Sequence, residues 1–359
     1  MLPFTSRLSA SLALLIYATL AVLALSPSGH AMGFGENGSW EPYYIPDQPQ
    51  TVGVGIKVDQ ITSIDQQSEN FGIVGTIIFK FSDPRLAYEV QGNQVPLRTM
   101  PLDAFLKIAR EKQVNLPSFI LSNQQGRRFV QQDMIVHHAN GDILYHERFT
   151  ATLQAPHFNF RRYPFDKQKF FVEVQALLPE THFKLTPIED LSGLGDMLGE
   201  EEWIPHNPKL EAITVQGPTG LDTSQVQLSF EANRHIQFYA LRILLPLLII
   251  LFVSWATFFL EEYRRRVDMA NANLLVFVAF NFAISTTLPR LGYLTFLDSL
   301  LVGMFVITGS MVLVNIALRR LKLNGREVLA KKIDRYLVIW VYPLTYAGFL
   351  FWAIRFYLL

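Results

Sequence analysis

Polar side chains interrupt an apolar stretch in the last third of the chain, at 267–288. At about 1.5 Å per residue, this stretch is long enough to cross a bilayer as a helix. Steps of four and three residues place six side chains on one face: Asp268, Ala272, Leu275, Ala279, Phe282 and Thr286. The face is acidic at one end, apolar in the middle and polar at the other end. This arrangement is typical of a pore wall, where an apolar constriction can lose its water and stop ion flow.

A second interpretation of the same stretch is a helix packed in a bundle. Asn271, Asn273 and Asn281 would then form hydrogen bonds to neighbouring helices, which stabilise helix association in membranes. The stretch alone leaves both interpretations open.

Four apolar segments are expected to be transmembrane helices, at 238–260, 267–288, 296–318 and 336–359. The links after the first and third segments carry clusters of Arg and Lys, whereas the link between the second and third carries only Arg290. By the positive-inside rule, the two basic links are cytoplasmic. The region before the first segment and the C-terminus are therefore expected outside.

The region before the first helix has a different pattern. Short runs of β-branched and aromatic residues alternate with Pro, Gly, Asn and Asp between 51 and 234. They predict an immunoglobulin-like β-sandwich of about ten strands, with one helix at 102–111. Residues 1–31 have a basic start, an apolar centre and small residues at the end, which indicates a secretory signal peptide; an additional transmembrane helix is the alternative. The expected domains are the signal peptide 1–31, an outer sandwich 32–236 and a four-helix membrane domain 237–359.

Composition excludes several classes of function. The chain has no cysteine, which excludes disulfides, thiolate zinc sites and cysteine nucleophiles. Its 31 basic and 31 acidic residues balance, so composition predicts no nucleic-acid partner. No metalloprotease, serine-hydrolase, phosphate-loop or dinucleotide motif is present. We therefore expect neither an enzyme nor a cofactor.

Ordered motifs then make the prediction more specific. The segment RRYPFDKQ at 161–168 resembles the aromatic-Pro-Phe-Asp loop of the pentameric ligand-gated ion channels, the Cys-loop receptor superfamily. Two cysteines bracket that loop in animal members, and Pro156 and Phe170 stand at those positions here, as in the cysteine-less prokaryotic branch. The resemblance continues in order through FSDPRLAY (81–88), HERFTA (146–151), LP (245–246), SW (254–255), AFN (279–281) and LP (288–289).

This resemblance implies a homopentamer with five copies of the 267–288 helix around a pore for monovalent ions. It also implies a bacterial inner membrane, with lipid as the other partner. Leu275 falls at the position of the family's mid-pore leucine ring, and we assign Leu275, Ala279 and Phe282 as the hydrophobic gate.

The resemblance also implies how the sandwich acts on the pore. Asp166 and Arg234 match a charge-bridging pair at the boundary between the two domains. We expect Asp65 and Pro289 to act with this pair in coupling the outer domain to the gate.

The ligand is less well predicted. Amine-binding members of the family hold the cation in an aromatic box, for which the candidates are Phe119, Tyr145, Phe183 and Trp203, with core packing as the alternative for each. An acidic run makes Glu200, Glu201 and Glu202 a candidate calcium site, with a solvated loop as the alternative. Protons, calcium and a small organic ligand therefore all stay open as the stimulus.

Ion selectivity depends on charges at the cytoplasmic end of the pore. Asp268 is expected to form an acidic ring that favours cations, while the arginines at 264–266 flank the same mouth. We expect a cation channel. The alternatives are an anion channel of the same family and a non-conducting, membrane-anchored envelope binding protein.

Overall fold

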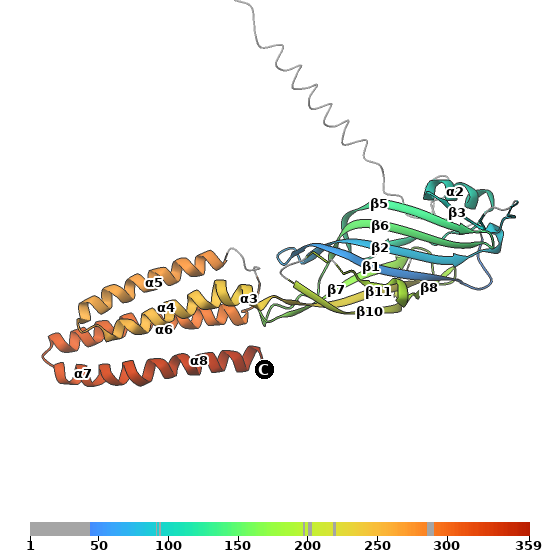
Figure 1. Ribbon diagram of the computed structural model, residues 1–359. Helices are drawn as coiled ribbons and strands as arrows, with labels where there is room; N and C mark the ends of the chain where they lie inside the picture. The colour runs from blue at the N-terminus through green and yellow to red at the C-terminus, as the bar shows by residue number, and fades with distance from the viewer. Residues whose placement is uncertain are drawn as a thin grey trace, which may run out of the picture.

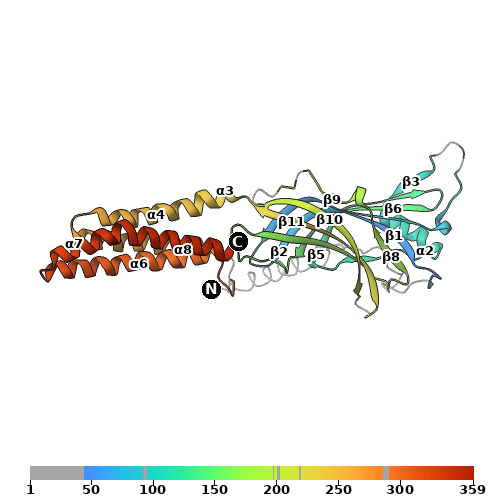
Figure 2. The same ribbon diagram turned by 90° about the horizontal axis from the view of Figure 1, so that it is seen from below.

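The structure is a computed structural model that describes residues 44–90, 92, 95–196, 198–199, 203–217, 220–285 and 291–359, without the side chains of 338 and 339. Strands precede helices along the chain, and the two parts lie end to end (Figures 1 and 2). The predicted fold class, a β-sandwich followed by apolar helices, is confirmed. The predicted signal peptide at 1–31 lies outside the described residues.

Two sheets form the sandwich. The first has the strand order β3-β5-β6-β2-β1-β8, with β9 paired to β1, and the second has the order β10-β11-β7-β4. The strands of the first sheet are β1 (Gln50–Asp65), β2 (Asn70–Ser82), β3 (Leu97–Met100), β5 (Gln124–His138), β6 (Asp142–Gln154), β8 (Phe183–Pro187) and β9 (Gly193–Leu194). Those of the second are β4 (Phe119–Leu121), β7 (Lys167–Ala176), β10 (Trp203–Gln216) and β11 (Asp222–Arg234). The short helical elements are η1 (Pro84–Leu86), α2 (Leu102–Glu111), where a helix was predicted, and η2 (Glu189–Leu191).

The core lies between the sheets because successive side chains of a strand point to opposite faces. Strand β6 shows this clearly, since every second residue from Ile143 to Leu153 is buried. Phe170 of β7 contacts Phe71 of β2 at 4.9 Å and Phe230 of β11 at 5.2 Å between ring centroids. Each such ring contributes about 1.5–3 kcal/mol through burial. The sandwich therefore gives the loops at its membrane end a rigid support.

One acid lies in the buried row of β6. Glu147 is fully buried, accepts a 2.5 Å hydrogen bond from the Tyr145 hydroxyl, and has its Oε1 3.2 Å from the Arg128 Nε. Burial raises the pKa of Glu147, although the charge of Arg128 and the Tyr145 hydrogen bond oppose this. The core thus contains a paired acid rather than an isolated charge.

His137 is a buried histidine that is expected to make the sandwich less stable in acid. Its ring is 2% exposed, and its Nε2 lies 2.8 Å from the carbonyl oxygen of Leu86. Burial lowers the pKa of His137 from 6.5, and the charges of Lys112 and Arg98 and the neighbouring His138 act in the same direction. The unfolded chain therefore binds more protons than the folded chain below about pH 6.5, and stability falls as pH falls through that value. We expect the melting temperature to drop between pH 7.5 and 5, and His137→Gln to reduce that drop. An equal drop in both proteins would contradict this role.

The second part of the chain consists of four helical rods. The first contains α3 (Ile236–Tyr239), η3 (Ala240–Leu244), α4 (Leu245–Ala256) and η4 (Thr257–Phe259). The others are α5 (Tyr263–Ser285), α6 (Phe296–Leu323), and a final rod of α7 (Glu327–Tyr336), η5 (Leu337–Val341) and α8 (Tyr342–Tyr357). Both η3 and η5 are π-helical turns, and each ends shortly before a proline, Pro246 or Pro343. Proline cannot donate to the preceding turn, and wider turns of this kind adjust the backbone in membrane helices.

Among the described residues, three helices are long and apolar enough to span a membrane: Ile236–Phe259, Tyr263–Ser285 and Phe296–Leu323. Helix α5, which covers 267–285 of the stretch 267–288 and is called the pore-type helix below, begins four residues earlier than predicted, at Tyr263. Helix α6 continues to Leu323, beyond the predicted end at 318. The last apolar segment forms a helix as predicted, but it shares its rod with the charged α7.

Gly303 lets α6 and α8 approach closely. A Cβ at this position would overlap the ring of Phe349, whereas Gly309 on the same helix has nothing within 4 Å of its Cβ position. We expect Gly303→Ala to destabilise the protein by about 1–3 kcal/mol through overpacking and Gly309→Ala to stay within about 0.5 kcal/mol of the native protein. Thermal unfolding in detergent measures both, and equal stability of the two variants would contradict this account of the packing.

Candidate functional site

The loop before β7 meets the helices at the membrane end of the sandwich. Its Tyr163–Pro164 peptide bond is cis. Gln168 closes the loop: its amide nitrogen donates to the carbonyl of Asn159 at 3.0 Å, and its amide oxygen accepts from the Asn159 N–H at 2.9 Å. The same amide nitrogen donates to Asp166. The loop therefore holds the Asp166 carboxylate in a fixed position.

Asp166 pairs with Arg234, as the motif predicted. The Arg234 Nε lies 2.9 Å from Oδ1, and Nη2 lies 3.4 Å from Oδ2. The two side chains are 0% and 1% exposed. A buried, two-point contact of this kind is directional, and loss of either partner leaves an unpaired buried charge. The pair therefore joins the last residue of β11 to the loop with a defined orientation.

Aromatic rings enclose the Arg234 guanidinium. Its centre lies 4.0 Å from the Trp203 ring centroid and 4.7 Å from that of Tyr163. Arg234 also donates a 2.9 Å hydrogen bond to the hydroxyl of Tyr239, in the first turn of the first helix. These cation–π and hydrogen-bond contacts connect the sandwich to that helix.

A second contact connects the loop to the helix that follows the pore-type helix. The Phe296 N–H at the start of α6 donates to the Arg161 carbonyl at 2.9 Å. The Phe160 N–H donates to the Tyr293 hydroxyl at 3.1 Å, and the Phe165 and Phe296 rings lie 5.8 Å apart. The loop is therefore in direct contact with residues at the start of α6 and just before it.

Of the other two predicted coupling residues, Asp65 and Pro289, the structure describes only Asp65. Asp65 caps the turn between β1 and β2, accepting from the backbone N–H groups of Ser68 at 3.0 Å and Gln67 at 2.8 Å. These hydrogen bonds, chiefly that from Ser68, hold the pKa of Asp65 below its usual value. The structure thus gives Asp65 a role within its own turn. Pro289 lies outside the described residues.

The pore-type helix α5 has one packed face and one open face. Its buried residues recur at steps of three, four and finally seven residues and face the bundle: Tyr263, Arg266, Ala270, Asn273, Phe277 and Ile284. The predicted pore face is exposed at all five of its described positions, Asp268, Ala272, Leu275, Ala279 and Phe282. Leu275 is 70% and Phe282 74% exposed. Thr286, the sixth predicted position, lies outside the described residues.

The bundle interpretation is correct for one of the three asparagines. Asn273 donates to the Ile250 carbonyl at 3.1 Å and to the Ser254 hydroxyl, and so fixes α5 to α4. Asn271 and Asn281 are exposed. Such a hydrogen bond stabilises helix packing in a membrane and sets the rotation of α5.

The four aromatic ligand candidates are core residues. Phe119, Tyr145, Phe183 and Trp203 are each 1% exposed and belong to the same sandwich core. The prediction of a ligand box from these residues is therefore wrong, and the alternative of core packing holds. Trp203 does contact a cation, but the cation is Arg234 of the same chain.

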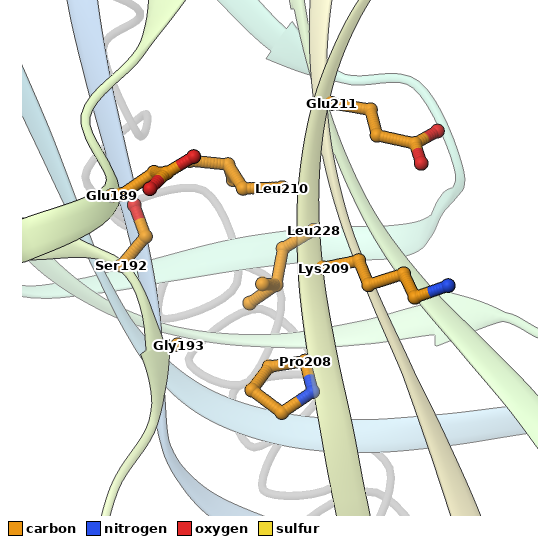
Figure 3. A pocket seen from close by; sticks show the side chains of 8 residues that line it. All are labelled: Glu189, Ser192, Gly193, Pro208, Lys209, Leu210, Glu211 and Leu228. Atoms are coloured by element: carbon orange, nitrogen blue, oxygen red, sulfur yellow. The ribbon is translucent and has the colours of Figure 1, made fainter.

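A groove of about 440 Å³ lies between the η2–β9 segment and strand β10 (Figure 3). Leu210, Leu228 and Pro208 give it an apolar lining, and the Glu189 side chain lies opposite them. The Ser192 hydroxyl at its rim is already engaged, accepting from the Ile56 N–H and donating to the Ile188 carbonyl.

The candidate calcium ligands Glu200, Glu201 and Glu202 lie outside the described residues. In the part of the chain that is described, no group of three or more His, Asp or Glu side chains is placed to hold a metal ion.

The junction role of Trp203, Tyr239, Tyr293 and Phe296 was not predicted; Trp203 was expected only as a ligand-box candidate. The four residues lie outside the quoted motifs, and neither apolar periodicity nor charge distinguishes them from other aromatic residues. Only position in the sequence could have indicated a junction role for two of them, because Tyr239 follows Arg234 by five residues and Tyr293 follows the pore-type helix.

Comparison with known proteins agrees with this arrangement. The family model of the neurotransmitter-gated ion-channel ligand binding domain matches residues 37–181. The chain is 25% identical over 301 residues to the proton-gated ion channel of Gloeobacter violaceus, covering 82% of this chain and 80% of that protein.

Two animal proteins are also similar. The γ-aminobutyric acid receptor subunit β-4 of Gallus gallus is 28% identical, with 72% of this chain and 52% of that protein covered. The pH-sensitive chloride channel 2 of Drosophila melanogaster is 23% identical, with 77% and 55% covered. The chain thus spans about half the length of these two relatives.

An outer sandwich joined through a buried ion pair to apolar helices, one with an open face, is the arrangement expected of a ligand-gated ion channel. The relatives found are ion channels and a receptor subunit, not enzymes. Together with the comparisons, these features support a prokaryotic-type pentameric ligand-gated ion channel, similar to the cysteine-less branch of the Cys-loop receptor superfamily.

Proposed function

We propose that this chain forms a homopentameric, cation-selective channel in a bacterial inner membrane, opened by a stimulus that acts on the outer sandwich. The observation that carries the proposal is the open face of α5, which is acidic at Asp268 and apolar from Leu275 to Phe282. Five such faces around an axis form a pore whose apolar section closes by losing water. The gate is Leu275, Ala279 and Phe282.

The orientation follows from charge. The clustered basic residues lie in the first turn of α5 and on both sides of the α6–α7 turn, and this end of the bundle lies in the cytoplasm, so the sandwich and the C-terminus face the periplasm. Membrane lipid then covers the exposed apolar sides of the outer helices, as on Phe351 and Trp352 of α8.

Cation selectivity is supported by the surroundings of the charges at the start of α5. Arg266 is turned into the bundle, and Arg265 pairs with Glu262 at 2.8 Å, while Asp268 lies on the open face. The acidic ring is then the main charge that ions meet. Anion selectivity is the second candidate, because Arg264 is exposed near the same end and one relative is a chloride channel.

Protons are the first stimulus to test, ahead of calcium and small organic ligands. The names of two relatives describe a response to protons or pH. Coupling runs from the sandwich through Asp166 and Arg234 to Tyr239 and the 293–296 segment.

The test is current recording from cells that express the chain, with external pH and calcium stepped separately and reversal potentials taken in diluted salt. We expect a current on acidification whose reversal potential moves toward that of the cation. A shift toward the chloride potential supports the second candidate. Protein confirmed at the surface but silent under acid, calcium and organic ligands contradicts the proposal.

A further inference from the structure

Three consecutive arginines lie at the start of α5, and their surroundings differ. Arg265 has a side chain 76% exposed, paired with Glu262. The Arg266 side chain is only 6% exposed. A buried guanidinium needs a counter-charge, so the partner of Arg266 decides where this side chain points.

That partner lies near the other end of the helical region in sequence. The Arg266 Nη1 is 2.6 Å from the Oδ1 of Asp334, whose side chain is 15% exposed. The Arg266 Nε donates to the carbonyl of Leu260, and the guanidinium lies 4.8 Å from the Tyr263 ring centroid. Arg266 therefore joins the end of the first rod, the first turn of α5 and helix α7.

Asp334 belongs to the last helical rod. Elements α7, η5 and α8 follow one another without a gap from Glu327 to Tyr357. The ion pair spans 68 residues of sequence and ties the base of the pore-type helix to this rod.

The position of Arg266 also matters for charge in the pore. It precedes Asp268 by two residues, which is about 200° around a helix, so Arg266 and Asp268 lie on opposite sides of α5. With the pair intact, the Arg266 charge is neutralised on the bundle side. Without Asp334, the Arg266 guanidinium keeps the Leu260 carbonyl and the Tyr263 ring as contacts but has lost its counter-charge there, and its long side chain can extend toward the nearby mouth of the pore.

We propose that Asp334 is a positioning residue that holds Arg266 away from the cytoplasmic mouth and thereby sets the charge that permeant ions meet. The inference rests on the proposed channel function. Loss of Asp334 releases one positive charge per subunit, which lowers the local cation concentration and raises that of anions.

The test compares reversal potentials in diluted salt. We expect Asp334→Asn to lower the cation-to-anion permeability ratio by about threefold or more, and Asp334→Glu, which keeps the charge, to remain near the native ratio. Glu327→Gln is the matched control, because Glu327 lies on the same helix and pairs with Lys331 at 3.2 Å and Lys322 at 3.8 Å. It should leave the ratio unchanged.

A charge swap keeps the proposal testable if Asp334→Asn alone does not fold. Arg266→Asp combined with Asp334→Arg restores the pair in reverse, and we expect this double variant to show the native permeability ratio. A native ratio in conducting Asp334→Asn channels overturns the role of Asp334, as does a double variant with a ratio far from the native one. A native chain at the surface that stays silent under every stimulus contradicts the channel function itself.

Discussion

Replacing Asp166 by Asn is expected to abolish the stimulus-evoked current and to destabilise the protein by about 3–5 kcal/mol, the range for removing one partner of a buried ion pair. The Arg234 guanidinium stays buried between Trp203 and Tyr163 but loses its counter-charge. Its fixed orientation toward Tyr239 then weakens, and with it the link between the sandwich and the first helix. Current, surface protein and thermal unfolding are measured on the same variant.

The matched control is the nearby Lys169–Glu231 pair, which joins β7 to β11 at 3.9 Å but is 65% and 35% exposed. Exposed pairs contribute about 0–1 kcal/mol, so Glu231→Gln should keep native stability and native current. Asp166→Asn channels that are folded and respond normally would show that the pair has no part in coupling.

Leu275→Ala is expected to open the pore without a stimulus. In the proposed pentamer five leucines form the narrow apolar ring, and shortening all five widens it and makes it easier to wet. A change of only about 1.4 kcal/mol in the closed–open balance gives a tenfold change in open probability when the open state is rare. We therefore expect the resting current to increase at least about tenfold, measured at neutral pH and normalised to surface protein.

Phe277→Ala separates the pore face from the packed face of the same helix. Phe277 is 1% exposed and its ring lies 5.8 Å from that of Phe305 on α6. We expect a loss of about 3–5 kcal/mol in stability. Its resting current per surface channel should rise less than that of Leu275→Ala. Resting current in Phe277→Ala alone would place the pore on the other face.

The open and packed faces of α5 were predictable because helix geometry forces a period of 3.6 residues. Sequence could show that Asp268, Leu275 and Phe282 share a face, and the structure leaves that face open. The sequence could not show that Asn273 would form hydrogen bonds to α4 while Asn281 would not. That difference depends on which residues of the neighbouring helix lie close to each asparagine.

The junction was predicted only where a motif marked it. Asp166 and Arg234 stand in recognisable positions, and the structure pairs them. No sequence motif identifies the aromatic rings that surround Arg234, because an aromatic residue is equally suited to a core, an interface or a ligand site. Trp203 illustrates the difficulty: the sequence suggested a ligand-box residue, whereas strand pairing turns it into the core against the same Arg234.

The central claim is that α5 lines a water-filled path with the face that contains Leu275. The native chain has no cysteine, so single cysteines placed in α5 can be modified selectively in purified protein reconstituted into planar bilayers. We predict that a charged thiol reagent changes the current through Leu275→Cys channels during stimulation and leaves Phe277→Cys channels unchanged. Modification that affects Phe277→Cys but not Leu275→Cys, or a native protein that carries no current under any stimulus, would contradict the account.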